Sequence, residues 1–229
     1  MPVRAPLPRG LALSPLSGLG SRVGSVVFQP GTHNLLVSRD DGAILLVGDG
    51  DRGPSPLIGR HTGKIRAMAF HPVSHVLAVA GDGTEVTFWD PKARRRMEPS
   101  LWLNDEGPGG SWINSIAFTA DGSLLAAGDS RGFVTVWDTS SHQRLHRWNA
   151  HSSAVNGLTF GGDPEMLATV GSDGFVGLWK KESFERVRAV QSPLPYDGVD
   201  LRRASGLTVL RRATLCALGA QTETPAQTT

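Results

Sequence analysis

The amino-acid sequence predicts an all-β protein built from four copies of one four-stranded unit. Each copy is marked by a phenylalanine that is followed nineteen residues later by an apolar residue, at intervals of 42, 48 and 42 residues: Phe28 and Val47, Phe70 and Trp89, Phe118 and Trp137, Phe160 and Trp179. Within each copy apolar and polar residues alternate, as they do in half-buried strands. The 28 glycines and 15 prolines among 229 residues suit tight turns between short strands. The repeat therefore defines the expected architecture.

The third copy shows the order of elements within a unit. It contains expected strands at 113–118 (INSIAF), 123–128 (SLLAAG) and 133–138 (FVTVWD), separated by short turns rich in Gly and Asp. Alternation joined by such turns predicts antiparallel hairpins. A more polar stretch follows the third strand of every copy, at 55–58, 94–103, 143–148 and 184–190. Its charge predicts an outer strand that completes each sheet.

Units of about 40–45 residues with four strands and a Trp-Asp pair are the signature of a propeller blade. Trp89-Asp90 and Trp137-Asp138 are such pairs, and the sequence resembles the WD-repeat β-propeller family over residues 23–190. The resemblance implies four blades, at about 23–58, 64–103, 112–148 and 154–190. Residues 1–22 are then an N-terminal segment that can supply an outer strand.

The resemblance also implies a structural tetrad, a hydrogen-bonded set that ties the third strand of a blade to the preceding loop. In the fourth repeat the matching residues are His151, Thr169, Asp173 and Trp179. Mutual hydrogen bonds would satisfy the buried carboxylate and the indole N–H. The second repeat keeps His61 and Trp89 but has Val79 and Gly83 at the hydroxyl and Asp positions. We therefore expect one complete tetrad.

Similar proteins usually close a ring of about seven blades, which needs roughly 300 residues. This chain has four recognisable repeats, so we expect a partial propeller that self-assembles or pairs with blades of another or a longer chain, the alternative being a closed four-bladed ring. Residues 191–220 are expected to form a Pro-rich junction and a short C-terminal helix capped by Thr208, and 221–229 a disordered tail. Residues 196–220 (YDGVDLRRASGLTVLRRATLCALGA) resemble the C-terminal ends of bacterial NACHT-type NTPase and pentapeptide-repeat proteins, which implies the sensor or docking end of a signalling NTPase.

Composition excludes several classes of protein. The 23 basic and 21 acidic residues leave a net charge of only +2, so nucleic acid is not the expected partner. The single cysteine, Cys216, excludes internal disulfides and multi-cysteine zinc sites. No apolar run approaches the roughly 20 residues that span a bilayer. Residues 1–22 lack the apolar core of a secretory signal, so we expect a cytoplasmic protein without a membrane partner.

The sequence offers no catalytic, cofactor or metal site. It has neither a P-loop nor a GxSxG elbow, and its GDGD and GDGT runs at 48–51 and 81–84 suit hairpin turns. The spaced pairs His71/His75 and His142/His146 lack a third metal ligand. The tetrad accounts for His151 and Asp173 without catalysis. The run at 94–96 of three arginines suits a solvated outer strand.

The expected binding residues lie on the loops that enter the inner strands. At the positions six and four residues before each marker phenylalanine, the side chains suited to binding are Arg22, Lys64, Arg66, Trp112, Asn114 and Asn156. A basic, amide-bearing rim with one Trp suits a protein or peptide partner. The alternative for Trp112 is simple packing between two blades.

Three functional hypotheses remain from the sequence. The favoured one is a non-catalytic scaffold or sensor that binds a protein or peptide through this rim. The alternative is a propeller enzyme of hydrolase or lactonase type that uses the central channel, although the expected inner strands contain no acidic residue. The third is a degraded remnant that does not fold stably.

Overall fold

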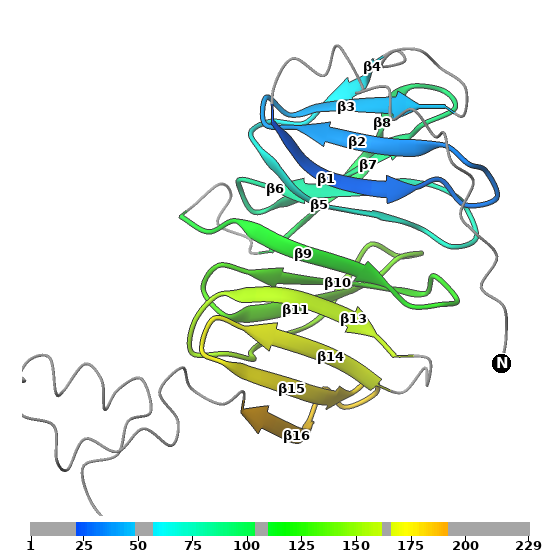
Figure 1. Cartoon of the computed structure of the whole chain (residues 1–229). Coiled ribbons are helices and arrows are strands. Elements are labelled where there is room, and N and C mark those ends of the chain that lie inside the picture. The colour runs from blue at the N-terminus through cyan, green and yellow to red at the C-terminus, as the bar shows by residue number, and fades with distance from the viewer. Residues whose placement is uncertain (1–21, 49–56, 104–109, 162–165, 192–229) are drawn as a thin grey trace, which may run out of the picture.

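The described residues form four antiparallel sheets, each made of four strands that follow one another in the chain (Figure 1). This computed structural model describes residues 22–48, 57–103, 110–161 and 166–191, and no helix occurs within them. The predicted all-β class with four four-stranded units is therefore confirmed. The predicted C-terminal helix lies outside the described residues, as do most of the N-terminal segment and the tail.

We call the sheets blades one to four and their strands inner, second, third and outer. The first two blades contain β1 (Val23–Phe28), β2 (Leu35–Arg39), β3 (Ala43–Val47), β4 (Leu57–Arg60), and β5 (Ile65–Phe70), β6 (Leu77–Gly81), β7 (Glu85–Asp90), β8 (Arg95–Trp102). The last two contain β9 (Ile113–Phe118), β10 (Leu124–Asp129), β11 (Phe133–Asp138), β12 (Arg144–Asn149), and β13 (Val155–Phe160), β14 (Met166–Gly171), β15 (Phe175–Lys180), β16 (Arg186–Gln191). Each marker phenylalanine ends an inner strand.

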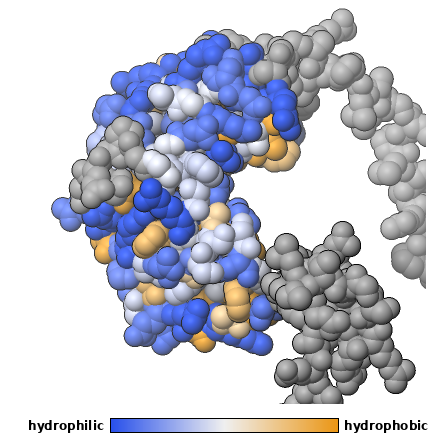
Figure 2. Space-filling model, turned by 90° about the vertical axis from the view of Figure 1, so that its left-hand side faces the viewer, coloured by the Kyte–Doolittle hydropathy of each residue, from blue (hydrophilic) through white to orange (hydrophobic). Residues whose placement is uncertain are grey.

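The blades follow one another around an arc. The inner strands of consecutive blades lie side by side, β1 next to β5, β5 next to β9 and β9 next to β13 (Figure 1). Figure 2 shows the arc as a C-shaped body with a hollow on its inner side. One end of the arc is blade one and the other is blade four.

The hydrophobic core lies in the seams, by which we mean the interfaces between consecutive blades. Each seam contains a tryptophan from the third strand of its later blade: Trp89, Trp137 and Trp179. Trp89 contacts the outer strand of blade one at Gly59, where a Cβ atom would overlap the indole ring. The glycine at position 59 is therefore needed for close approach of the two blades.

Candidate functional site

The four inner strands begin at one edge of the arc, and a cavity of about 350 Å³ lies there. Its lining comes from all four blades and consists of Arg22, Val23, Gly24, Asp40, Lys64, Ile65, Arg66, Asn114 and Asn156. Five of the six binding residues expected from the sequence thus line one cavity. The sixth, Trp112, does not line it. We call this the rim cavity.

A β-bulge places a polar side chain at the rim in each of the last three blades. The pairing between inner and second strand shifts register around Arg66, Asn114 and Asn156, which have no paired residue on the neighbouring strand. A bulged residue leaves the regular alternation between the two faces of a sheet, so its side chain can be turned toward the sheet edge. The bulges therefore explain why three residues at equivalent positions converge on the cavity.

Ion pairs hold the basic side chains of the rim cavity. Lys64 Nζ lies 3.1 Å from Asp40 Oδ1, and Arg66 Nε donates a 2.8 Å hydrogen bond to Asp82 Oδ1. Because these pairs are partly exposed, each contributes little to stability, typically about 0–1 kcal/mol. Together with Arg22, three cations meet two carboxylates at the rim.

Trp112 extends the rim cavity through Arg66. The guanidinium carbon of Arg66 lies 5.1 Å from the centre of the Trp112 ring, within the range of a cation–π contact. The tryptophan side chain is 43% exposed, so it both connects blades two and three and offers an aromatic surface to solvent. The contact with Arg66 agrees with packing between the two blades, and binding of a partner by Trp112 stays a prediction.

The two asparagines form hydrogen bonds that fix their orientation. Asn114 Nδ2 donates to the carbonyl oxygen of Val155 at 3.0 Å and so links blade three to blade four. Asn156 Nδ2 donates to Ser172 Oγ at 2.9 Å, and that hydroxyl is 3.1 Å from Asn156 Oδ1. Side chains held in this way are preorganised for binding a ligand.

In blade four, hydrogen bonds join all the residues of the expected tetrad. His151 Nδ1 lies 2.9 Å from Asp173 Oδ1, His151 Nε2 lies 2.8 Å from Thr169 Oγ1, and Trp179 Nε1 donates to the same hydroxyl at 2.9 Å. Burial opposes ionisation of Asp173. Hydrogen bonds from the Phe175 N–H, from His151 and from the Ser152 N–H outweigh it and hold the pKa of this carboxyl below its ordinary value. The arrangement is a structural clamp.

Blade two has a clamp that was not predicted from the sequence. Thr87 Oγ1, on the third strand, accepts a 3.0 Å hydrogen bond from Trp89 Nε1 and lies 3.2 Å from His61 Nδ1. Its own hydroxyl donates to the carbonyl oxygen of Val79. The family resemblance implies a hydroxyl only at position 79, on the second strand. The signal that could have identified Thr87 is the strand register, because Thr87 pairs with Val79 on the neighbouring strand and so lies beside the expected hydroxyl position.

Blade three has a different clamp, built on a buried ion pair. Arg147 Nη2 donates at 2.8 Å to Asp129 Oδ2, whose side chain is 0% exposed, and Arg147 Nη1 donates at 2.7 Å to Thr135 Oγ1. The remaining carboxylate oxygen accepts from the backbone N–H groups of Arg131 and Phe133. Every blade from two to four thus has a polar clamp, each with its own chemistry.

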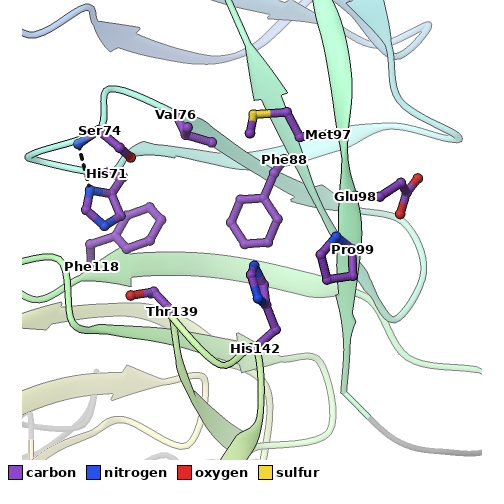
Figure 3. A pocket seen from close by; sticks show the side chains of 10 residues that line it. All are labelled: His71, Ser74, Val76, Phe88, Met97, Glu98, Pro99, Phe118, Thr139 and His142. Carbon is purple, nitrogen blue, oxygen red and sulfur yellow. Dashed lines mark hydrogen bonds between the residues drawn. The ribbon is translucent and has the colours of Figure 1, made fainter.

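A second cavity, of about 150 Å³, lies between blades two and three at the opposite ends of the inner strands (Figure 3). Apolar and aromatic side chains dominate its walls: Phe88, Phe118, Val76, Met97, Pro99, His71 and His142. His71 Nδ1 accepts hydrogen bonds from the backbone N–H groups of Val73 and Ser74, which fixes the ring beside Phe118. This slot is large enough to cover one apolar side chain.

The described residues show neither a metal centre nor a membrane span. Within the four described stretches no three His, Cys, Asp or Glu side chains come close enough together to hold a metal ion. The same residues include no helix with the length and hydrophobicity that crossing a membrane requires.

Comparison with known proteins identifies the repeats. The family described as "WD domain, G-beta repeat" matches residues 55–90, 104–138 and 142–180. The chain is 28% identical over 149 residues to Pre-mRNA-processing factor 19 homolog 2 of Arabidopsis thaliana, covering 63% of this chain and 27% of that protein. It is 25% identical over 115 residues to a component of Chromatin assembly factor 1 of Mus musculus, covering 42% and 19%.

A shorter match is more similar. The chain is 40% identical over 62 residues to Spindle assembly checkpoint protein bub3 of Schizosaccharomyces pombe, covering 27% of this chain and 18% of that protein. The chain therefore spans less than a third of the length of each of these three relatives. Sequence matches and architecture agree, since each matched stretch contains the inner, second and third strands of one blade: β5 to β7, β9 to β11 and β13 to β15. The chain thus contains repeats of the WD-repeat family, and its four four-stranded sheets are consistent with blades of a WD-repeat propeller.

Proposed function

We propose that this chain is a protein-interaction scaffold that binds an acidic, extended segment of a partner protein in the rim cavity. The observation that carries the proposal is the convergence of Arg22, Lys64, Arg66, Asn114 and Asn156, from all four blades, on one open cavity. Similarity to relatives named for pre-mRNA processing, chromatin assembly and a spindle assembly checkpoint supports an assembly role.

Charge selects the chemistry of the ligand. Asp40 and Asp82 each pair with one cation, which leaves Arg22 without a charged partner among the described residues. A carboxylate of the ligand can bind an arginine through two parallel hydrogen bonds, the strongest arrangement for such a pair. A ligand with Asp or Glu therefore complements the rim better than a neutral or basic one.

The asparagines suit an extended backbone. A carboxamide has two N–H donors and an oxygen with two lone pairs, so each asparagine can donate to and accept from a peptide backbone while it keeps the hydrogen bonds that orient it. Asn114 and Asn156 stand at equivalent bulges of adjacent inner strands, so the spacing between the inner strands sets the distance between the two side chains. The Trp112 ring, which contacts the Arg66 guanidinium, adds an aromatic surface beside the cationic groups.

The alternative of a propeller enzyme lacks support at this cavity. Asp40 is the one carboxylate in its lining, and that group pairs with Lys64 rather than with a second acid or a histidine. The link to a signalling NTPase rests on residues 196–220, which lie outside the described part of the chain.

Peptide-array binding followed by fluorescence anisotropy tests the proposal. The probes are twelve-residue peptides rich in Asp and Glu, each matched with a peptide in which Asn and Gln replace the acids. We expect acidic peptides to bind and the double variant Lys64→Glu/Arg66→Glu to weaken binding at least tenfold, about 1.4 kcal/mol or more. The control Lys92→Glu/Arg95→Glu makes the same charge change on exposed residues of the turn between β7 and β8 and its flank.

Two outcomes would overturn the proposal. Equal loss of affinity in both charge-reversal variants would mean that net charge, rather than the rim cavity, attracts acidic peptides. Absence of any acidic peptide that binds more tightly than its amide counterpart would mean that the cavity does not recognise carboxylates. The Asn114→Ala variant adds a neutral check, because it removes hydrogen bonds without changing charge.

A further inference from the structure

Positions that face a neighbouring blade within the arc hold exposed valines at its two ends. In blade four the residues concerned are Val170, Val176 and Val190, which are 42%, 37% and 45% exposed. In blade one they are Val23 and Val26, which are 48% and 59% exposed. We call the blade-four set the leading face and the blade-one set the trailing face.

The leading face is one row of side chains that crosses three strands. Val170 pairs with Val176, and Val176 pairs with Val190. The equivalent row of blade two consists of Ala80, Val86 and Leu101, which are 0%, 0% and 3% exposed because blade three covers them. The row of blade four thus has the position and polarity of a seam surface.

The trailing face is the other half of the same kind of seam. Positions 23 and 26 of blade one correspond to Ile65 and Met68 in blade two, Ile113 and Ile116 in blade three, and Val155 and Leu158 in blade four. All six of these residues are at most 9% exposed, and each pair lies in the seam with the preceding blade.

The internal seams show which residues would meet. Gly128, the blade-three equivalent of Val170, lies against Val155, and a Cβ atom on it would be 3.3 Å from Leu158 Cδ2. By equivalence, Val170 would meet Val23 and Val26 of another blade one. In the seam of blades three and four a Cβ atom on Gly128 would overlap Val155 Cγ1, and Val23 is the residue equivalent to Val155. A valine at position 170 therefore requires a wider spacing between blade four and blade one than that seam has.

We propose that blade four of one copy of this chain packs on blade one of a second copy, so that two arcs close one eight-bladed ring. The contact joins unlike faces, and two such seams related by a twofold axis close the assembly, whereas unlike faces that fail to close would give open filaments. The C shape of the arc in Figure 2 fits closure by a second C. Eight blades lie within the range of four to eight typical of propellers.

The proposed ring contains two identical seams between the copies, and both contribute to holding the dimer together. Each seam repeats the packing already present between blades two and three and between blades three and four, so the proposed interface continues an interface that the chain itself forms. Both seams must open before the copies separate, which raises the stability of the dimer beyond that of one seam. This inference concerns assembly and does not depend on what the rim cavity binds.

Cysteine cross-linking of the purified 229-residue chain tests which faces meet. The variants Val170→Cys and Val26→Cys are each made with Cys216→Ser, which removes the one natural thiol. We expect a mixture of the two to form a disulfide-linked dimer on mild oxidation, and neither variant to do so alone. The variant Val73→Cys, at a side chain that is 69% exposed in a turn of blade two, gives the collisional background when mixed with Val26→Cys.

Light scattering of the unmodified chain provides the second measurement. We expect the mass of two chains, and the mass of one chain for Val176→Asp, with the far-ultraviolet spectrum unchanged. A single-chain mass for the unmodified protein at tens of micromolar, with cross-linking no higher than the Val73→Cys background, overturns the proposal; another segment of the chain or blades of another protein would then cover the faces. Cross-linking of Val170→Cys with itself also overturns it, because like faces would be meeting.

Discussion

Thr87 in blade two and Thr169 in blade four each accept a hydrogen bond from the tryptophan of their own blade, but Thr87 lies on the third strand and Thr169 on the second. Thr87 lies on the third strand opposite Val79, and Thr169 lies on the second strand opposite Gly177. Both hydroxyls accept from the tryptophan Nε1, at 3.0 Å and 2.9 Å, and both contact a histidine. Each of these two clamps therefore needs one buried hydroxyl, which either the second or the third strand can supply.

Exchange of the hydroxyl between the two strands is the first prediction. Thr87→Gly removes the acceptor for Trp89 and should lower the free energy of unfolding by about 1–3 kcal/mol. Adding Val79→Thr should restore part of this loss, because the pair then has the arrangement of blade four. Chemical denaturation checks both variants.

In the blade-four arrangement a glycine, Gly177, must stand opposite the threonine, and this requirement supplies a control variant. A Cβ atom on Gly177 would lie 2.8 Å from Trp179 Nε1 and 3.0 Å from Thr169 Oγ1. The variant Val79→Thr alone, which keeps Thr87, should therefore be less stable than Val79→Thr/Thr87→Gly. If the double variant were the less stable of the two, the hydroxyls would not be equivalent.

The second prediction concerns the buried ion pair of blade three. Arg147→Met should destabilise the fold by about 3–5 kcal/mol, since it leaves the Asp129 carboxylate buried without its cation. Asp129→Asn/Arg147→Met should be more stable than Arg147→Met alone, because an amide costs less to bury and its oxygen can still accept from Arg131 and Phe133. Thermal unfolding of the two variants decides the order.

The third prediction follows from the contact of Gly59 with Trp89. Gly59→Ala should lower the free energy of unfolding by about 1–3 kcal/mol, because the methyl group overlaps the indole ring. In a Trp89→Leu background the same substitution should cost less. A double-mutant cycle measures the difference, and additive effects would show that the two residues do not interact.

The fourth prediction concerns pH. Burial lowers the pKa of His61 below the ordinary value of 6.5, and the net effect of the surrounding charges does not reverse this. Below about pH 6.5 the unfolded chain then binds more protons than the folded chain, so stability falls as the pH falls. His61→Gln cannot titrate and should show a smaller loss of melting temperature between pH 7.5 and 5.5. An equal loss in both proteins would assign the effect to other groups.

The fifth prediction concerns the second cavity. Arg94, His142 and Phe184 occupy equivalent turn positions with positive φ values of 54°, 60° and 55°. In the seam of blades three and four, Phe184 stacks on His146 with ring centres 5.0 Å apart. His142→Phe should fill the open slot in the same way and raise stability by about 0.5–2 kcal/mol, whereas His142→Asn, which also tolerates positive φ, should not.

The repeat spacing made most of the fold predictable. Phe118 ends the inner strand and Trp137 lies in the third strand, and the recurrence of this nineteen-residue spacing in four copies indicates a repeated unit. The rim was predictable for the same reason, since Arg66, Asn114 and Asn156 share one position in the repeat. The cause of their convergence was not predictable, because a β-bulge has no fixed sequence pattern.

Residues outside the repeat pattern account for the features that were not predicted. Arg147 on β12 reaches Asp129 on β10 across the intervening strand β11, and neither blade two nor blade four has such a pair at equivalent positions. Thr87 was overlooked because the expected tetrad places its hydroxyl on the second strand. The position of Trp112 beside the rim cavity, rather than within its lining, depends on a ring contact with Arg66 that spacing does not show.

The polar clamps also imply an order of opening along the arc. In blade one, Val37 faces Leu45 where the later blades have a threonine or its partner, so at that position no side-chain hydroxyl adds to the backbone pairing of its second and third strands. Regions with few buried contacts and exposed inner strands exchange their amide protons soonest. In an isolated chain the amide protons of β1 and β2 should therefore exchange with deuterium before those of β6 and β10, and the molecule should unravel from its N-terminal blade toward the clamped ones.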